Sequence, residues 1–155
     1  MSLLLTTKKI IKEWTDYNNH MNLSYYILVF DMGGEVILSK FKMGEHSAKT
    51  TKKSTMGVET HTTYNNEVKQ GEEVDIFLTY FDHDKKRLHF KMEMYEKTKK
   101  TLSATIEMLS LYIDLNQRKV SEFEEEKTKI MDEFISKNKS NFKSDPLLFS
   151  TKLKK

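Results

Sequence analysis

The chain of 155 residues contains no cysteine, and this absence removes several kinds of chemistry at once. A disulfide framework, a zinc site built from thiolates and a cysteine nucleophile all need a thiol, so all three are excluded. Long apolar runs are also missing: none approaches the ~20 residues that span a bilayer. Leu3 to Leu5 are too few for the apolar part of a signal peptide. We therefore expect a cytoplasmic protein with no membrane segment.

The chain also has no large excess of positive or negative charge. Lys and Arg total 26 against 23 for Asp and Glu, which gives a net charge of only +3 and argues against a nucleic-acid partner. The single proline, Pro146, lies near the end, and no repeat or Ser/Gly linker divides the chain. This predicts one core, in residues 1–120, with residues 121–155 forming a C-terminal helix and a charged tail packed on the same domain.

Residues 23–43 are apolar nearly all round, which predicts a buried helix rather than a surface one. Asn22 is a suitable N-cap for it. Gly33 and Gly34 weaken the middle of this helix and favour a kink there.

After the helix the apolar period changes from 3.6 to 2, which is typical of strands. The alternating segments are residues 56–64, 74–80, 88–94 and 102–114. With a short strand around residues 9–13, the order predicts an α+β fold in which one buried helix packs on an antiparallel sheet of about five strands. Ser121 and Glu124 form a capping-box pattern before a C-terminal helix, and the charge density beyond Lys137 is typical of a poorly ordered tail.

The link before the long helix is unusually polar. Asp16 lies a few residues ahead of the helix start, where unpaired backbone N–H groups and the positive end of the helix dipole favour negative charge. Such amides polarise a carbonyl and stabilise the oxyanion formed on attack, while Asp16 attacks directly or removes a proton from water. The alternative interpretation is that Asp16, Asn18 and Asn22 only build a turn and a helix cap.

The pattern Asp-x-x-x-His-Met-Asn-x-x-x-Tyr, formed by Asp16, His20, Met21, Asn22 and Tyr26, resembles the helix-start signature of the 4-hydroxybenzoyl-CoA thioesterase family of hotdog proteins. The longer string Trp-x-Asp-Tyr-Asn-x-His-Met-Asn is still more similar to the betainyl-CoA thioesterase-like branch of that family. The resemblance covers roughly residues 10–118, and it is specific in the first block and diffuse elsewhere.

The resemblance implies a hotdog fold over residues 1–120, in which a curved antiparallel sheet wraps a long helix. It implies a homo-oligomer, a dimer or a tetramer, with active sites at a dimer interface. The implied activity is hydrolysis of an acyl-CoA thioester without a cofactor. Asp16 matches the catalytic carboxylate, as nucleophile or general base, and the backbone amide of Leu23 matches the donor that polarises the carbonyl.

The remaining site residues are assigned to substrate binding or to shaping the site: Asn18, His20, Asn22, Tyr26, Glu59 and His61. Two positions depart from the family pattern. Asn19 stands where glycine is common, although asparagine also tolerates a left-handed backbone. Leu23 stands where many members have a second asparagine, which leaves the backbone donor intact.

Weaker candidates lie elsewhere in the chain. Glu59 and His61 share one face of a strand, opposite Met56 and Val58, and either reach a partner subunit's site or form a solvated face. The histidines outside this region lack metal-ligand spacing with carboxylates, so no metal is predicted. The lysines Lys49, Lys52 and Lys53 either contact the phosphates of CoA or form an ordinary polar surface.

Two other functions compete with hydrolysis. One is a non-catalytic module that binds acyl thioesters, since a fold alone does not fix function. The other is hydration or dehydration of an acyl thioester, which is less favoured because those hotdog sites pair a histidine with an acid in a different motif. The acyl group, and the choice between dimer and tetramer, stay open at this point.

Overall fold

The computed structural model describes residues 2–143 and 146–155 of the chain. Its strands are β1 (Leu3–Lys9), β2 (Lys53–Tyr64), β3 (Glu73–His83), β4 (Arg87–Glu96), β5 (Leu102–Asp114) and β6 (Lys119–Val120). Its α-helices are α1 (Leu23–Lys40), α2 (Glu45–Thr51) and α3 (Glu125–Asn138), with short 3-10 turns at Lys12–Trp14, Lys139–Asn141 and Ser150–Lys152. Among these residues no helix is both long and apolar enough to cross a membrane.

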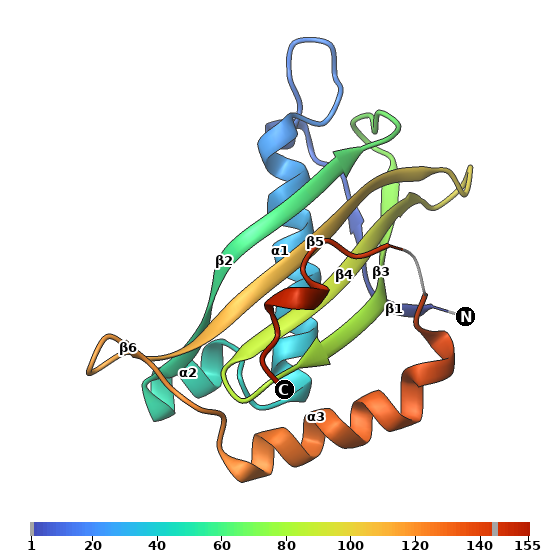
Figure 1. The fold of residues 1–155 in the computed structure, drawn as a ribbon. Helices are drawn as coiled ribbons and strands as arrows, with labels where there is room; N and C mark the ends of the chain where they lie inside the picture. The colour runs from blue at the N-terminus through green and yellow to red at the C-terminus, as the bar shows by residue number, and fades with distance from the viewer. Residues whose placement is uncertain (1, 144–145) are drawn as a thin grey trace.

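The strands form one antiparallel sheet in the order β1-β3-β4-β5-β2, and the short β6 pairs with the end of β5. The sheet curves around α1, which lies against its inner face (Figure 1). This arrangement confirms the predicted α+β class and the hotdog fold. β1 and β2 are the two edges of the sheet, so each presents one unpaired side.

The long helix was predicted correctly at its start. The Asn22 side chain accepts a hydrogen bond from the Ser24 N–H at 3.2 Å, and α1 then continues without interruption to Lys40. Val29 and Phe30 are 0% exposed and Ile37 is 1% exposed, because they face the inner side of the sheet. Burial of this face stabilises α1 more than helix propensity does.

Gly33 allows α1 to approach the sheet closely. A Cβ atom at this position would lie 2.8 Å from Cγ2 of Ile76 and 3.4 Å from Sδ of Met92. At the neighbouring Gly34, a Cβ atom would have nothing within 4 Å. A side chain at position 33 would therefore clash with the sheet, whereas a Cβ atom at position 34 would meet no other atom.

Alanine substitutions at these glycines are expected to have opposite effects on stability. Gly33→Ala overpacks the contact with Ile76 and should lower the free energy of unfolding by about 1–3 kcal/mol. Gly34→Ala removes a helix-interior glycine without a clash and should raise it by about 0.5–1 kcal/mol. Urea denaturation of both variants measures the difference. Equal stabilities would show that α1 does not lie this close to the sheet.

Two local predictions were wrong, and one helix was not predicted. The first strand is Leu3–Lys9 rather than residues 9–13, and a 3-10 turn occupies Lys12–Trp14. The capping box does not form: Glu124 makes no side-chain cap bond, since its carboxylate accepts the Tyr112 hydroxyl at 2.6 Å. Helix α2 (Glu45–Thr51), which contains Lys49, was not predicted from the sequence.

A bulge in β2 changes which side chains share a face. The pairing of β2 with β5 shifts between Gly57 and Glu59. Met56 pairs with Leu111 and Glu59 with Leu109, so both lie on the outer face of the sheet, away from α1. The predicted opposition of Met56 to Glu59 is therefore wrong, because one extra residue reverses the alternation.

The C-terminal segment crosses the outer face of the sheet (Figure 1). Residues 146–155, here called the C-terminal strap, contact acidic side chains there. Lys152 lies 3.6 Å from Glu59, and the Lys154 N–H donates to Asp84 at 2.8 Å. The poor order expected beyond Lys137 is wrong for residues 137–143 and 146–155, and residues 144–145 lie outside the described part.

A buried hydrogen bond between a histidine and a carboxylate lies under the strap. His89 is 0% exposed and its Nε2 lies 2.7 Å from Oε2 of Glu107. Glu107 also accepts hydrogen bonds from the backbone N–H groups of Leu148 at 2.9 Å and Phe149 at 2.8 Å. Burial alone would raise the pKa of Glu107, but these donors and His89 outweigh it and lower the pKa below its ordinary value. The strap is thus fixed to the centre of the sheet.

Candidate active site

The turn before α1 is closed by its own backbone. The Asp16 N–H donates to the His20 carbonyl at 3.0 Å, and the Asn19 N–H donates to the Asp16 carbonyl at 3.0 Å. Asn19 has a φ of 62°, in the left-handed region that asparagine tolerates. The turn therefore persists with asparagine where the family pattern has glycine, as expected.

The carboxylate of Asp16 is held by backbone donors. Its Oδ1 accepts from the Asn18 N–H at 2.8 Å and from the His20 N–H at 3.3 Å. No described residue donates to Oδ2. Asp16 is half-buried, so one oxygen is fixed in place while the other can meet a substrate or a water molecule.

Contacts with the β2–β3 connection fix the position of this turn. The Met21 N–H donates to the Val68 carbonyl at 2.7 Å, and the Gln70 N–H donates to the Asn19 carbonyl at 2.9 Å. Nδ1 of His20 lies 3.1 Å from Oε2 of Glu67. His20 therefore contacts the neighbouring loop.

The same turn folds back onto the start of α1. The Asn22 N–H donates to the Trp14 carbonyl at 2.9 Å, and Thr15 forms a β-bridge with Met21. Leu23, the first residue of α1, has no intrahelical acceptor for its N–H. Leu23 is 61% exposed, and its N–H has no hydrogen-bond acceptor among the described residues.

Tyr26, in the first turn of α1, is buried against Tyr64 of β2. It is 5% exposed, and its ring meets the edge of Tyr64 at 5.3 Å between centroids. Burial raises the pKa of Tyr26 above its ordinary value, so the hydroxyl stays protonated at neutral pH. Tyr25, one residue earlier, stacks on Trp14 at 6.3 Å.

Glu59 and His61 are not brought to the Asp16 turn within one chain. Both lie on the outer face of the sheet, where His61 pairs in register with Glu107. Glu59 contacts Lys152 of the C-terminal strap at 3.6 Å. Among the described residues no group of three or more metal-binding side chains comes together.

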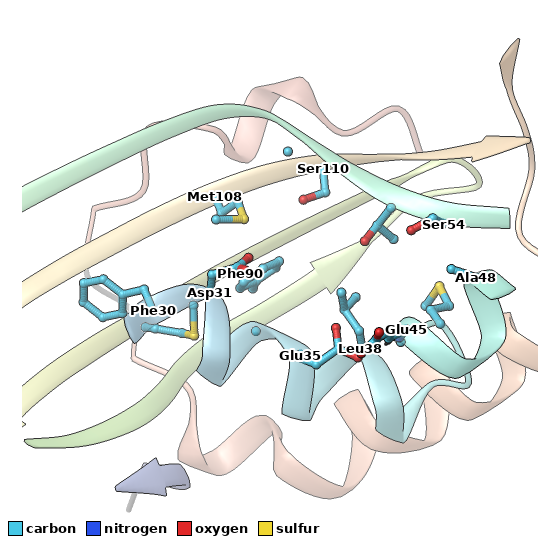
Figure 2. A pocket seen from close by; sticks show the side chains of 16 residues that line it. Phe30, Asp31, Glu35, Leu38, Glu45, Ala48, Ser54, Phe90, Met108 and Ser110 are labelled. Atoms are coloured by element: carbon cyan, nitrogen blue, oxygen red, sulfur yellow. Dashed lines mark hydrogen bonds between the residues drawn. The ribbon is translucent and has the colours of Figure 1, made fainter. Parts of the chain in front are cut away.

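A cavity of about 310 Å³ lies beside the C-terminal half of α1, between α1, α2 and strands β2, β4 and β5. Figure 2 shows Asp31, Glu35 and Leu38 of α1 along one side, with Met108 and Ser110 of β5 across from them. The sequence reasoning missed this cavity. The available signal was the pair of acids four residues apart, Asp31 and Glu35, in an otherwise apolar helix.

This chain is similar to known proteins in sequence and in fold. Residues 11–134 match the model of the thioesterase-like superfamily. A betainyl-CoA thioesterase from Pseudomonas aeruginosa is 29% identical over 128 residues, which cover 81% of this chain and 80% of that protein.

Two solved structures illustrate the likeness of fold. A Staphylococcus aureus protein in complex with CoA superposes with a TM-score of 0.80 at 22% identity, covering 100% of this chain and 96% of that one. A 1,4-dihydroxy-2-naphthoyl-CoA thioesterase from Synechocystis gives a TM-score of 0.74 at 13% identity, covering 85% and 96%. The chain therefore belongs to the thioesterase-like superfamily and is a thioester hydrolase with the hotdog fold.

Proposed function

We propose that the chain hydrolyses an acyl-CoA thioester to a carboxylic acid and free CoA, with Asp16 as general base or nucleophile. The observation that carries the proposal is the carboxylate of Asp16, held by the N–H groups of Asn18 and His20 in the turn that leads into α1. Acyl transfer needs a base or nucleophile and a donor for the oxyanion. The Asp16 carboxylate and the N-terminal N–H groups of α1 are the two candidates for these roles.

The reaction follows from these two groups. The thioester carbonyl accepts a hydrogen bond from the Leu23 N–H, and the helix dipole stabilises the oxyanion that forms on attack. As base, Asp16 takes a proton from water while the water oxygen bonds to the carbonyl carbon. The C–S bond then breaks, and the CoA thiolate leaves and takes up a proton. As nucleophile, Asp16 forms an acyl-carboxylate anhydride that water then hydrolyses.

Named relatives favour CoA as the leaving group. The Pseudomonas aeruginosa relative is named for a CoA thioester, and the Staphylococcus aureus structure holds CoA. In this reading Asn18, His20 and Asn22 hold the turn, and Tyr26 forms its wall. A cytoplasmic location stays a prediction.

Release of free thiol from a panel of acyl-CoAs tests the proposal. The panel should include short, branched, aromatic and charged acyl groups. Because the chain has no cysteine, the protein contributes no thiol background. Turnover of at least one thioester supports the proposal, whereas binding of CoA esters without any turnover would contradict it.

We also propose that the working unit is a homodimer joined along β2. Eleven large hydrophobic side chains are exposed among the described residues, and six of them lie on two elements. These six are Leu23, Ile27 and Leu28 on α1 and Met56, Val58 and Tyr64 on β2. β2 is a 12-residue edge strand, so a second copy can extend the sheet across a two-fold axis.

A charge placed on this edge should separate the subunits. Val58 on β2 is 47% exposed, and Val120 on β6 is 46% exposed and serves as a matched control. Val58→Asp is expected to weaken dimer association by roughly ten-fold or more, because the new charge loses water at the interface. Sedimentation velocity over a concentration series measures the effect. If Val58→Asp and Val120→Asp behave alike, β2 does not form the interface.

A further inference from the structure

The turn that contains Asp16 belongs to a small antiparallel patch of three short segments. Asp16 lies across the turn from His20, because the Asp16 N–H donates to the His20 carbonyl at 3.0 Å. His20 in turn forms an antiparallel bridge with Lys69 of the β2–β3 connection. This patch lies at the end of the molecule where α1 begins (Figure 1). Asp16, His20 and Lys69 therefore form one cross-strand row.

Side chains in such a row point to the same face. Opposite residues on antiparallel segments have Cβ atoms roughly 4.5–5.5 Å apart, and residues two positions apart on one segment share a face. Glu67 lies two residues before Lys69, and its Oε2 lies 3.1 Å from Nδ1 of His20. The His20 ring therefore lies on the face shared by Glu67 and Lys69. Pairing across the turn places the Asp16 side chain on that face as well.

Glu67 fixes the tautomer of His20. A carboxylate only accepts hydrogen bonds, so Nδ1 of His20 carries a proton and donates it to Oε2 of Glu67. Nε2, on the other side of the ring, has no hydrogen-bond partner among the described residues. The His20 side chain is 34% exposed, so a bound molecule can reach the ring. Nε2 is therefore the nitrogen available to exchange a proton with a substrate.

We propose that His20 is a catalytic residue that protonates the departing sulfur of CoA, with Glu67 as its positioning residue. The inference rests on the proposed thioesterase function, in which the donor of this proton is unassigned. When the C–S bond breaks, its electron pair moves to sulfur, and the proton on Nε2 of His20 passes to that sulfur. The neutral ring then regains a proton released by the water molecule that enters the reaction. Glu67 holds the ring on the face that carries Asp16.

A proton donor has its largest effect when Asp16 is the nucleophile. The tetrahedral intermediate can then expel either the Asp16 carboxylate or the thiolate. Reference pKa values of about 3.9 for aspartate and about 8.5 for an alkyl thiol such as cysteine make the carboxylate the weaker base and the better leaving group. Without a proton on sulfur, the intermediate therefore returns to substrate. Protonation by His20 makes the thiol leave instead, and the acyl group stays on Asp16 until water hydrolyses it.

Two thioesters of one acid with different leaving groups test this role. One is an acyl-CoA that the native protein cleaves, and the other is the thiophenyl ester of the same acid, whose aryl thiolate is a weak base and leaves without a proton. His20→Asn keeps an N–H donor near the position of Nδ1 and removes Nε2. We expect it to lower kcat/KM for the acyl-CoA by about 10²-fold or more, and for the thiophenyl ester by less than about ten-fold.

His46→Asn, at an exposed position of α2, is the matched control and should leave both rates unchanged. Equal losses on the two esters in a folded His20→Asn protein, or no loss on the acyl-CoA, would overturn the inference and leave the thioesterase function intact. If native protein cleaves no acyl-CoA at all, the proposed function itself fails.

A cycle of variants, measured on the acyl-CoA alone, tests the positioning role of Glu67. Glu67→Gln keeps an oxygen acceptor but removes the charge, and should lower kcat by about two- to five-fold with KM unchanged, the range that an exposed ion pair supports. In the His20→Asn protein the same change should have no further effect, since Glu67 acts through the ring. Glu13→Gln, at another exposed acid, should be silent in both backgrounds. If Glu67→Gln has the same effect without the His20 ring as with it, Glu67 does not position the ring.

Discussion

Asp16→Asn is expected to lower kcat/KM for thioester hydrolysis by about 10²–10⁴-fold. An asparagine Oδ1 can still accept the N–H groups of Asn18 and His20, so the turn should keep its shape. An amide cannot remove a proton from water or attack a carbonyl, so the chemical step should fail while binding persists. Thiol release at saturating and limiting substrate separates kcat from KM.

Glu13→Gln provides the matched control for this loss. Glu13 is an exposed acid three residues before Asp16, and its replacement removes the same charge without touching the turn. This variant should retain native turnover. If Asp16→Asn keeps more than roughly a tenth of native kcat/KM in a folded protein, Asp16 is neither base nor nucleophile.

Glu107→Ala is expected to lower the free energy of unfolding by about 3 kcal/mol or more, because each buried donor left without an acceptor costs about 1–3 kcal/mol. Glu107 is 3% exposed, and its removal leaves His89 and the N–H groups of Leu148 and Phe149 without their acceptor. Nδ1 of His89 already has no partner among the described residues. Urea denaturation measures the loss, and His89→Leu in the same chain should recover part of it.

The same carboxylate should make stability depend on pH. The pKa of Glu107 is lower in the folded protein than its ordinary value, so its contribution is complete above the ordinary pKa of about 4.3 and is lost as pH falls through the folded value. Native protein should therefore lose more stability between pH 7 and pH 3 than Glu107→Ala does. Glu133→Ala, at an exposed site, is the control. If native protein and Glu107→Ala lose the same stability between pH 7 and pH 3, or if Glu107→Ala alters this loss no more than Glu133→Ala does, Glu107 does not anchor the strap.

The elements that could be predicted from the sequence are those with strong local signals. Residues 23–40 are mostly apolar and follow a good N-cap residue, and Asn22 caps α1 as expected. The strands of the central sheet alternate apolar and polar residues, which fixed their positions closely. The block around Asp16 was noticed because polar side chains are unusually dense there, and the resemblance to the thioesterase family singled out Asp16 within it. The structure shows that the backbone of this segment closes a turn.

The failures have physical causes beyond local pattern. Ser121 and Glu124 have the spacing of a capping box, but the Tyr112 hydroxyl, from a different strand, takes the Glu124 carboxylate. The bulge between Gly57 and Glu59 inserts one residue, which alternation alone does not reveal. The first strand was misplaced because pairing with β3, rather than polarity, selects Leu3–Lys9.

The cavity and the strap depend on long-range contacts. Asp31 and Glu35 could be read only as exposed acids of a helix, because the strands that complete the cavity are distant in sequence. The lysines of the strap resemble a solvated tail until their acidic partners on the sheet are known. Tertiary contacts therefore supply the parts of the site that local composition cannot.

The close approach of α1 to the sheet also limits how the sequence can change over evolution. A side chain at position 33 meets Cγ2 of Ile76, the β-branch of that residue. Leucine at position 76 has no second group on Cβ and would relieve this contact. Position 76 must therefore lose its branch before position 33 can accept alanine, so relatives with alanine at position 33 should carry an unbranched residue at position 76. The two positions are expected to covary, and the order of their substitutions is set by one interatomic contact.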